Sequence, residues 1–506
     1  MKTAAKTLKF LDNPLLDSYM PSRARKRKEE DPSLLGEIKG LVQSVYIRKV
    51  PSYGNSVFYS LGFLLLVTFV ILALSGIIMV IFGPFWWNTT TWGTFVRSIH
   101  MWAAFAFGTI LILHVFVTFS TSAFLKRKLV WMVGSILLFL VLLEEAFGLG
   151  IRGDFVSQWN DLSAADLWNG IGLGYWVNPL NWGALYGWHI AIIPLILMIL
   201  IAVHFSLVKR RGISTPYRND IPYSMVEASH KKLYQRALVL TAIIILFALF
   251  FRAPYVAPVT IQSVAQSSPN IVAMTLLQEF NHTSGTATYL DTIDPYTFNT
   301  RTVYVTIPYN QYINISGSTD AEALFNSENI SEQSTNINSA YAYFRDNGTI
   351  NASVNPSNPL IAVISSLVLM AKSGLYQSSL SYQETSGFDQ TYILRFLSDT
   401  GTMNTIATKD GLQLQQFGMI KNNPGLWPPG SWWVAPYNLL DITILSNDPN
   451  ADFDGGMIAL GFFALLVLFP FIPYLNKIPD KLRLHKLFWN RFTIPEYKKG
   501  KNRRNR

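Results

Sequence analysis

The sequence predicts an all-α membrane protein with six transmembrane helices and a large α+β domain inserted between the fifth and sixth helices. Half of the 506 residues are hydrophobic and only 14% are charged, whereas a soluble domain carries about a quarter charged residues. Six apolar runs are each about twenty residues long, which is enough to cross a bilayer. A long polar stretch separates the last two runs, and it predicts the inserted domain.

The placement of basic residues predicts the orientation of the chain. The six spans are expected at 57–82, 97–119, 130–150, 186–208, 233–252 and 456–475. Basic segments precede the first span, lie between the second and third, follow the fourth and end the chain, at 23–28, 126–128, 209–211 and 498–504. Six spans place all of these segments on one face of the membrane, and loops rich in Lys and Arg stay cytoplasmic. We therefore expect a multi-pass protein of the plasma membrane with both termini in the cytoplasm. No signal peptide is expected, because the N-terminus has no short apolar core followed by a cleavage site.

The outer face is expected to carry most of the polar sequence. The insertion is rich in Asn, Ser and Thr; alternation in Thr302–Ile307 predicts strands there, and Leu360–Leu369 predicts a short buried helix. Glycosylation of this face is predicted by acceptor sequons at Asn88, Asn281, Asn314, Asn329, Asn347 and Asn351.

Four of the seven histidines lie inside predicted spans. His100 and His114 are fourteen residues apart in the second span, and His189 and His204 are fifteen apart in the fourth. Each pair is separated by roughly 21 Å along its helix and faces one side. Two antiparallel helices of this kind can hold two stacked cofactors, with His100 and His189 forming an outer pair and His114 and His204 an inner pair. A single histidine at such depth can be a hydrogen-bonded core residue, but four at matching depths indicate function.

Bis-imidazole haem is the cofactor that fits two such pairs, because the axial ligands saturate the iron for electron transfer. The absence of cysteine excludes thiolate ligands on this chain. Two haems are expected, of b type or alternatively of a type. Glycines at the same fourteen-residue spacing, Gly62 and Gly76 in the first span and Gly134 and Gly148 in the third, predict room for the macrocycles. Close helix packing alone is the alternative explanation for any one of them. The predicted bundle is therefore a four-helix di-haem bundle.

Further motifs surround these residues. Arg97 stands three residues before His100, Trp131 three before Gly134, and Pro194 lies between His189 and His204. The fourth span is followed by Gly212-Ile213-Ser214-Thr215-Pro216. Together these features resemble the cytochrome b family of quinol-oxidising bc complexes across all six spans, and the last motif resembles the loop after the family's fourth helix. The resemblance implies that Arg97 binds a propionate of the outer haem and that Trp131 lies at the inner haem.

The resemblance also implies an activity and partners. The chain would be the catalytic subunit of a quinol:electron-acceptor oxidoreductase that carries electrons from quinol across the membrane, coupled to proton translocation. Its partners would be a Rieske iron–sulfur protein, the quinone pool and a terminal oxidase or another electron acceptor. A further membrane subunit would supply the two C-terminal helices that mitochondrial members have and this chain lacks.

The resemblance fails at the family's quinol-site motif P-E-W-Y. Its best counterpart runs from Pro429 to Tyr437, and Ser431 stands where the glutamate should be, followed by Trp432 and, further on, Pro436. We expect the quinol pocket to include these three residues.

Two glutamates in the third span offer a replacement carboxylate. Glu144 and Glu145 lie near the outer surface, four and three residues before Gly148. A carboxylate in lipid is costly unless it is paired or functional. We hypothesise that one of them accepts the quinol proton, and the alternative is a salt bridge, for example to Arg152.

These observations divide the chain into six regions: a cytoplasmic segment 1–55, the di-haem bundle 56–215, a cytoplasmic loop with the fifth span 216–253, the extracytoplasmic insertion 254–427, the quinol-site segment with the sixth span 428–476, and a basic tail 477–506.

Two other function classes compete with this interpretation. A di-haem membrane anchor of a dehydrogenase or hydrogenase shares the haem bundle but lacks a P-E-W-Y-like segment. A haem-free glycosylated receptor or surface-layer anchor leaves the four matched histidines unexplained. The net charge of +10 does not indicate nucleic-acid binding. The basic residues cluster at both ends of the chain and beside the apolar runs, which is the placement expected for a membrane protein. The charge-poor exterior and the lack of cysteine suggest a prokaryote from a hot or acidic habitat, an archaeon.

Overall fold

The computed structural model describes residues 49–170, 173–174, 176–216, 223–289, 298–346, 350, 357–384, 386–421, 423, 430–448 and 451–489. The described residues from Val50 onward belong to one compact unit. Predictions for most of the N-terminal segment, for the end of the basic tail, and for Asn347, Asn351 and Pro429 lie outside the described residues.

Six helices of the described chain are long and apolar enough to cross a membrane, which confirms the six predicted spans. They cover Leu61–Thr89 (α3), Thr91–Ser120 (α4), Lys128–Gly150 (α6), Trp182–Arg210 (α8, η5 and α9), His230–Phe250 (α10) and Phe453–Phe471 (α23 and η10). The first helix is broken near its end, where Gly83 has a φ of 77° and precedes Pro84. Only glycine adopts this backbone geometry without strain.

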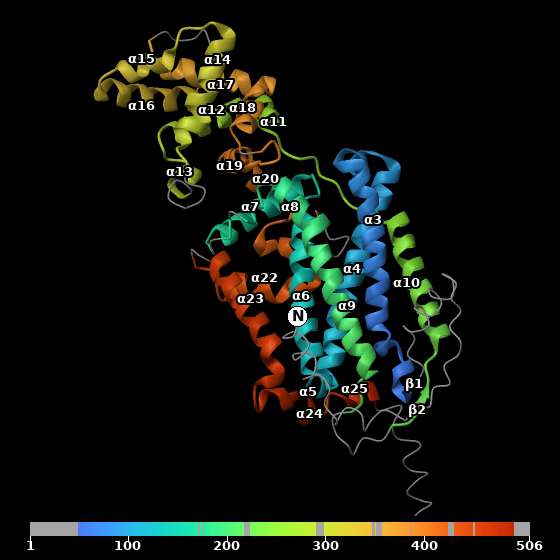
Figure 1. Cartoon of the computed structure of the whole chain (residues 1–506). Helices are drawn as coiled ribbons and strands as arrows, with labels where there is room; N and C mark the ends of the chain where they lie inside the picture. The colour runs from blue at the N-terminus through green and yellow to red at the C-terminus, as the bar shows by residue number, and fades with distance from the viewer. Residues whose placement is uncertain are drawn as a thin grey trace, which may run out of the picture. The chain divides into compact units, whose positions relative to one another are not determined.

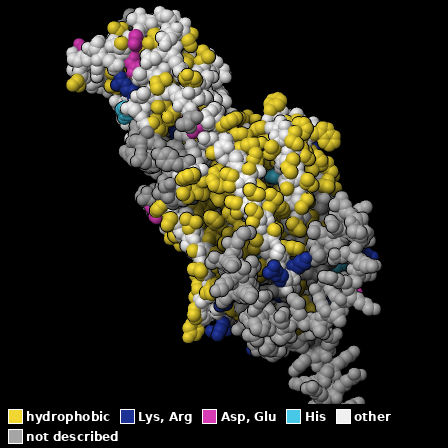
Figure 2. Space-filling view, in the orientation of Figure 1, with side chains coloured by type: hydrophobic (Ala, Val, Ile, Leu, Met, Phe, Trp, Pro, Cys, Tyr) yellow, Lys and Arg dark blue, Asp and Glu magenta, His cyan; other side chains and the backbone are white. Residues whose placement is uncertain are grey.

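The membrane helices run side by side (Figure 1), with α3 packed against α4 and α6 packed against α9. The helix α10 contacts α3 and α4, and α23 (Ala451–Leu468) contacts α6. Hydrophobic side chains cover most of the face of these helices that Figure 2 shows. Such a surface suits hydrocarbon, where charged side chains are rare.

The fourth span consists of three parts: α8 (Trp182–Gly187), the π-helical turn η5 (Trp188–Ile192) and α9 (Ile193–Arg211). Its start is capped by Asn181, whose side chain accepts a hydrogen bond from the backbone N–H of Ala184 at 3.0 Å. Single π-helical turns within α-helices occur frequently at functional sites. This turn carries His189.

The other described elements are short. A two-stranded sheet joins β1 (Lys49–Pro51) to β2 (Met225–Glu227), and these are the only strands among the described residues. The remaining helices before the insertion and after it are η3 (Ser52–Asn55), η4 (Val57–Tyr59), α5 (Ala123–Lys126), α7 (Phe155–Gly170), η9 (Trp432–Val434), α22 (Ala435–Thr443), η10 (Phe469–Phe471), η11 (Leu475–Lys477), α24 (Ile478–Lys481) and α25 (Lys486–Trp489).

The described part of the insertion contains helices joined by loops and no strand, so the strands predicted at Thr302–Ile307 are wrong. Thr302–Thr306 forms the π-helical turn η7, and α14 begins at Ile307. The insertion contains α11 (Ile261–Ser267), α12 (Pro269–Phe280), α13 (Gly285–Tyr289), η7, α14 (Ile307–Ser316), α15 (Ala321–Ser327), α16 (Ile330–Asp346), α17 (Pro359–Ser373), α18 (Leu375–Gln383), α19 (Thr391–Asp399), α20 (Thr402–Asp410), η8 (Leu414–Gln416) and α21 (Gly418–Lys421).

The buried helix predicted at 360–369 is confirmed as the centre of the insertion. It is α17, which begins with Pro359 in its first turn and ends at Gly374, where φ is 87°. The side chain of Asn358 caps it by accepting hydrogen bonds from two backbone N–H groups. Its apolar side chains share one hydrophobic cluster with residues of α7, including Phe155 and Val156.

Backbone hydrogen bonds join the insertion to the loop that precedes the fourth span. The N–H of Phe155 donates to the carbonyl of Val256 at 2.9 Å, and the N–H of Gln390 donates to the carbonyl of Leu180 at 2.9 Å. The N–H of Trp182 donates to the carbonyl of Phe388 at 3.0 Å. The insertion is therefore anchored within eight residues of His189.

Candidate functional site: paired histidines and a buried carboxylate

The two outer histidines face one another across the bundle. His100 lies on α4 and His189 on η5, and their ring centres are 6.3 Å apart. Two imidazoles that share one metal ion, each bonded through a nitrogen at about 2 Å, have ring centres roughly 6 Å apart. The spacing of the outer pair therefore fits one ion held between the two rings.

The inner histidines are also close enough to interact electrostatically. His114 lies on α4 about four helical turns beyond His100 and on the same face, and His204 lies on α9. Among the described residues there is no cluster of three or more His, Asp or Glu side chains that could hold a bare metal ion. A protein site for a bare ion needs about three or four side-chain ligands, whereas haem needs two axial ligands. The pairs fit haem better than a bare ion.

Each of the four predicted glycines lies against one of the four histidines. An added Cβ at Gly76 would lie 3.5 Å from Cε1 of His100, and one at Gly62 would lie 3.6 Å from Cε1 of His114. The corresponding distances are 3.3 Å between Gly134 and His204 and 2.6 Å between Gly148 and His189. The glycines on α3 and α6 therefore leave room for the imidazole rings themselves.

Arg97 lies beside the outer pair in a buried polar network. Its guanidinium donates to the side-chain oxygen of Asn88 at 2.6 Å, to the carboxylate of Asp154 at 2.9 Å and to the carbonyl of Pro254 at 3.0 Å. Asp154 is fully buried and also pairs with Arg152 at 2.8 Å. One carboxylate between two guanidiniums leaves net positive charge here, which suits an anionic group such as a propionate.

Trp131 lies at the other end of the bundle. Its indole N–H donates to the carbonyl of Leu466 at 2.6 Å, which joins the third span to the sixth. Its ring is 5.1 Å from that of Phe124, centre to centre. The residue is therefore fixed close to the start of α6, as its place in the sequence predicts.

Glu145 is brought into contact with the P-E-W-Y-like segment. Its carboxylate accepts a hydrogen bond from the hydroxyl of Ser431 and another, at 2.8 Å, from the indole N–H of Trp433. Ser431 is the residue that stands in place of the motif's glutamate. A carboxylate therefore lies against this segment although it comes from a different helix.

Trp432 and Pro436, the other two residues predicted for the quinol pocket, have no hydrogen bond to Glu145 among the contacts described. The indole N–H of Trp432 donates to the hydroxyl of Thr109 at 3.1 Å. Pro436 is in the first turn of α22, where a proline loses no hydrogen bond. The indole of Trp433 lies against Gly108, where any Cβ would collide with it.

Glu144 points elsewhere. Its carboxylate oxygen Oε1 lies 3.2 Å from Nδ1 of His189, and its backbone carbonyl oxygen lies 3.0 Å from the same nitrogen. The salt bridge considered between either glutamate and Arg152 is not formed, because Arg152 pairs with Asp154. Within the described residues neither glutamate has a Lys or Arg partner.

The sequons differ in their accessibility. The side-chain amide of Asn88 donates to the carbonyl of Arg152 at 3.1 Å, and its oxygen accepts from Arg97. This asparagine is committed to the network, which argues against its glycosylation. Asn281, Asn314 and Asn329 are exposed.

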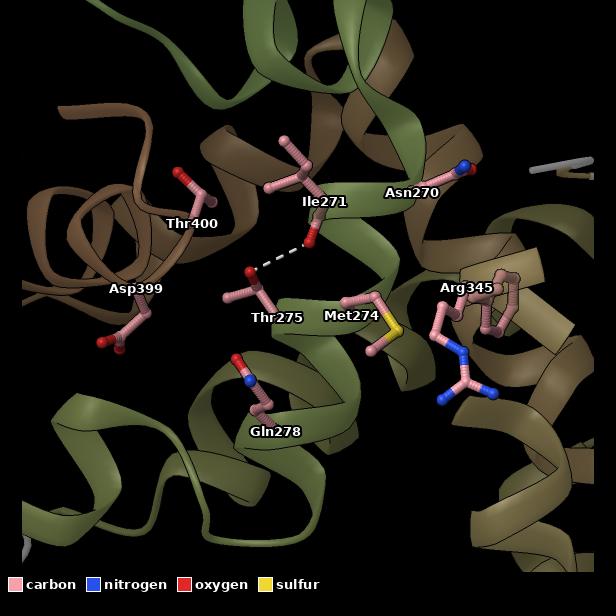
Figure 3. A pocket seen from close by; sticks show the side chains of 9 residues that line it. Asn270, Ile271, Met274, Thr275, Gln278, Arg345, Asp399 and Thr400 are labelled. Carbon is pink, nitrogen blue, oxygen red and sulfur yellow. Dashed lines mark hydrogen bonds between the residues drawn. The ribbon is translucent and has the colours of Figure 1, made fainter. Parts of the chain in front are cut away.

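The insertion has a pocket of about 370 Å³ between α12, α16 and α19. In Figure 3, Asp399 and Arg345 lie on opposite sides of Met274 and Thr275. Asp399 accepts hydrogen bonds from the backbone N–H of Thr286, and Arg345 pairs with its exposed neighbour Asp346. The charged groups are thus engaged elsewhere, and the pocket shows no converging reactive side chains.

Sequence reasoning missed four residues that shape the site. Asp154 and Trp433 had no distinguishing motif, although Trp433 adjoins Trp432 in the quoted segment. Gly108 lies outside the fourteen-residue pattern, and Ser75, whose hydroxyl lies 2.9 Å from Nδ1 of His100, immediately precedes Gly76. A search for polar residues beside the glycines would have found Ser75.

Comparisons with known proteins agree on one family. The family model described as cytochrome b (N-terminal)/b6/petB matches residues 105–269. Cytochrome b6 of Heterocapsa triquetra is 28% identical over 211 residues, which cover 36% of this chain and 94% of the relative. Cytochrome b6 of Rippkaea orientalis is 28% identical over 206 residues, which cover 36% of this chain and 91% of the relative.

A chain of a solved structure titled "Hyperthermophilic respiratory Complex III" is 18% identical, and the match covers 68% of this chain and 93% of that one. Its TM-score of 0.34 is too low to support an inference about the fold. The sequence matches and the six membrane helices, two of which carry the four histidines, lead to one assignment. The chain belongs to the bc-type cytochrome b family and is a membrane protein of electron transfer.

Proposed function

We propose that this cytochrome b oxidises quinol at an outer pocket and carries electrons across the membrane through two haems, coupled to proton translocation. The observation that supports this most directly is the set of two histidine pairs, each ring backed by a glycine of a neighbouring helix. His100 and His189 would hold the outer haem, and His114 and His204 the inner one. When bound, the haems supply reversible one-electron chemistry at iron.

The two electrons of quinol would leave the outer pocket by different routes. Quinol gives up two electrons and two protons. One electron passes to an iron–sulfur partner of the Rieske type, since the chain has no cysteine with which to hold such a cluster. The two haems that these histidine pairs would hold would give the other electron a way inward, toward quinone at the cytoplasmic face.

We further propose that Glu145 accepts the first proton from the quinol hydroxyl in the outer pocket. Ser431 and Trp433 hold its carboxylate with two neutral donors, and no Lys or Arg of the described residues neutralises it. A base must lie within hydrogen-bond reach of the proton it takes. Glu145 meets the motif segment itself, whereas Glu144 faces a histidine.

The haem content tests the core of the proposal. A reduced-minus-oxidised spectrum and a pyridine haemochrome assay of the purified chain should give two low-spin haems. His100→Ala and His114→Ala should each remove a different one. A single haem, or none, would show that the histidine pairing is wrong, and the quinol mechanism would fall with it.

The proton acceptor has its own test. Glu145→Gln, with both haems retained, should slow quinol oxidation by about 10²-fold or more, which is the usual contribution of a general base. The double variant Glu145→Gln with Ser431→Glu returns a carboxylate to the motif's own position and should recover part of the rate. Glu145→Gln acting at the parent rate would refute the assignment.

A further inference from the structure

Glu144 faces His189, one of the four histidines that would hold the proposed pair of haems, and its role rests on that proposed function. His189 is the only one of the four paired histidines with a carboxylate beside its ring among the described residues. The Nδ1 atom of His100 faces the neutral hydroxyl of Ser75 instead. The environment of the four rings is therefore asymmetric.

The contacts of His189 define its tautomer. Two oxygens of Glu144, the backbone carbonyl at 3.0 Å and Oε1 at 3.2 Å, face Nδ1. An oxygen acceptor needs a donor, so Nδ1 carries the hydrogen and Nε2 keeps its lone pair. Nε2 is then the nitrogen free to bind iron.

The same helix fixes the orientation of the ring. Gly148 lies one helical turn beyond Glu144 on α6, and its backbone lies so close to Cε1 of His189 that a Cβ there would be only 2.6 Å away. Glycine and glutamate therefore hold the imidazole edge between them. The π-helical turn Trp188–Ile192 presents the histidine to this site.

Apart from His189, the carboxylate of Glu144 has no hydrogen-bond partner among the described residues. Its second oxygen, Oε2, is buried and has no hydrogen-bond partner among the described residues. Burying a carboxylate is costly unless it is hydrogen-bonded. The contact with the Nδ1 hydrogen of His189 offsets that cost, and this contact gives the residue a role distinct from that of its neighbour Glu145.

We propose that Glu144 is a positioning residue that sets the reduction potential of the outer haem through His189. A carboxylate that accepts the Nδ1 hydrogen of a metal-bound imidazole fixes the ring and makes it a stronger electron donor. A stronger donor stabilises the oxidised iron, and hydrogen bonding around an axial ligand is one of the levers that set haem potentials. Glu144 therefore lowers the potential of the outer haem relative to the inner one.

Redox titration of the purified, haem-loaded chain tests the inference by a readout other than activity. In Glu144→Gln, which keeps the shape and removes the charge, the midpoint of the outer haem should move to a more positive potential while that of the inner haem stays in place. Glu145→Gln is the matched control, because the adjacent carboxylate has no contact with a paired histidine. It should leave both potentials unchanged although quinol oxidation falls.

The outcomes separate this inference from the proposed function. An outer haem with an unchanged midpoint in Glu144→Gln would overturn the role of Glu144 and leave the two haems intact. A parent chain without two haems would overturn the proposed function and this inference with it. If Glu144→Gln loses the outer haem, the variant Glu144→Asp, which keeps the carboxylate, is measured instead. Retention of the outer haem in Glu144→Asp supports the positioning role, and loss of the outer haem in Glu144→Asp overturns it.

Discussion

The four glycines opposite the histidines leave unequal room, and the difference can be measured. A Cβ at Gly148 would lie 2.6 Å from Cε1 of His189, whereas one at Gly62 would lie 3.6 Å from Cε1 of His114. The first distance forces the ring to move, and the second is an ordinary van der Waals contact. Gly148→Ala should therefore deplete the outer haem, and Gly62→Ala should keep both. Haem stoichiometry per chain measures this, and equal losses in the two variants would contradict it.

At the same scale, the histidine pairs are predicted from local spacing, and the carboxylate contacts are not. The spacing of His100 and His114 along one helix predicts their depth in the membrane and the side of the helix that they share. The contact between Glu145 and Trp433 joins residues 288 positions apart, and no local pattern encodes such a distance. The sequence offered Glu144 and Glu145 as equal candidates, and only the tertiary contacts distinguish them.

Among the elements, the apolar spans and the buried helix α17 were predictable because length and hydrophobicity define them. The segment 302–307 was not. Its alternation of Thr or Tyr with Val or Ile resembles a half-buried strand, but Val303, Tyr304 and Val305 are all buried in succession. A strand with one solvated face would bury only alternate residues. The segment is therefore buried on all sides and has no solvated face. Within this core the hydroxyl of Tyr304 donates a hydrogen bond to the carbonyl of Tyr392 at 3.0 Å.

The end of α18 carries a carboxyl group, that of Glu384, which we expect to make the stability of the insertion depend on pH. Burial, reinforced by the nearby charge of Asp389, raises the pKa of Glu384 from 4.5 to about 8, against a hydrogen bond from the N–H of Tyr392 that lowers it. Between about pH 4.5 and about pH 8, Glu384 therefore keeps its proton in the folded chain and loses it in the unfolded chain. Stability from this group is complete below about pH 4.5 and declines as the pH rises toward 8.

Glu384→Gln should remove this dependence, because an amide stays neutral. The full chain in detergent should melt a few degrees lower at about pH 8 than at about pH 5, with the effect reduced by partial exposure of the side chain. In the variant the difference should shrink. A parent chain and variant with the same pH dependence would show that Glu384 titrates normally.

For the whole molecule, the absence of cysteine allows the proposed orientation to be tested with single introduced thiols. Ser318 in the insertion and Lys209 at the end of α9 are both exposed, and six spans with basic loops inside place them on opposite faces of the membrane. In intact cells a membrane-impermeant maleimide should label Ser318→Cys, and Lys209→Cys should react only after the membrane is opened. The parent chain is the blank. The reverse labelling pattern would place the insertion in the cytoplasm, and proton release from the Glu145 pocket would then face inward, against the direction proposed for this cytochrome b.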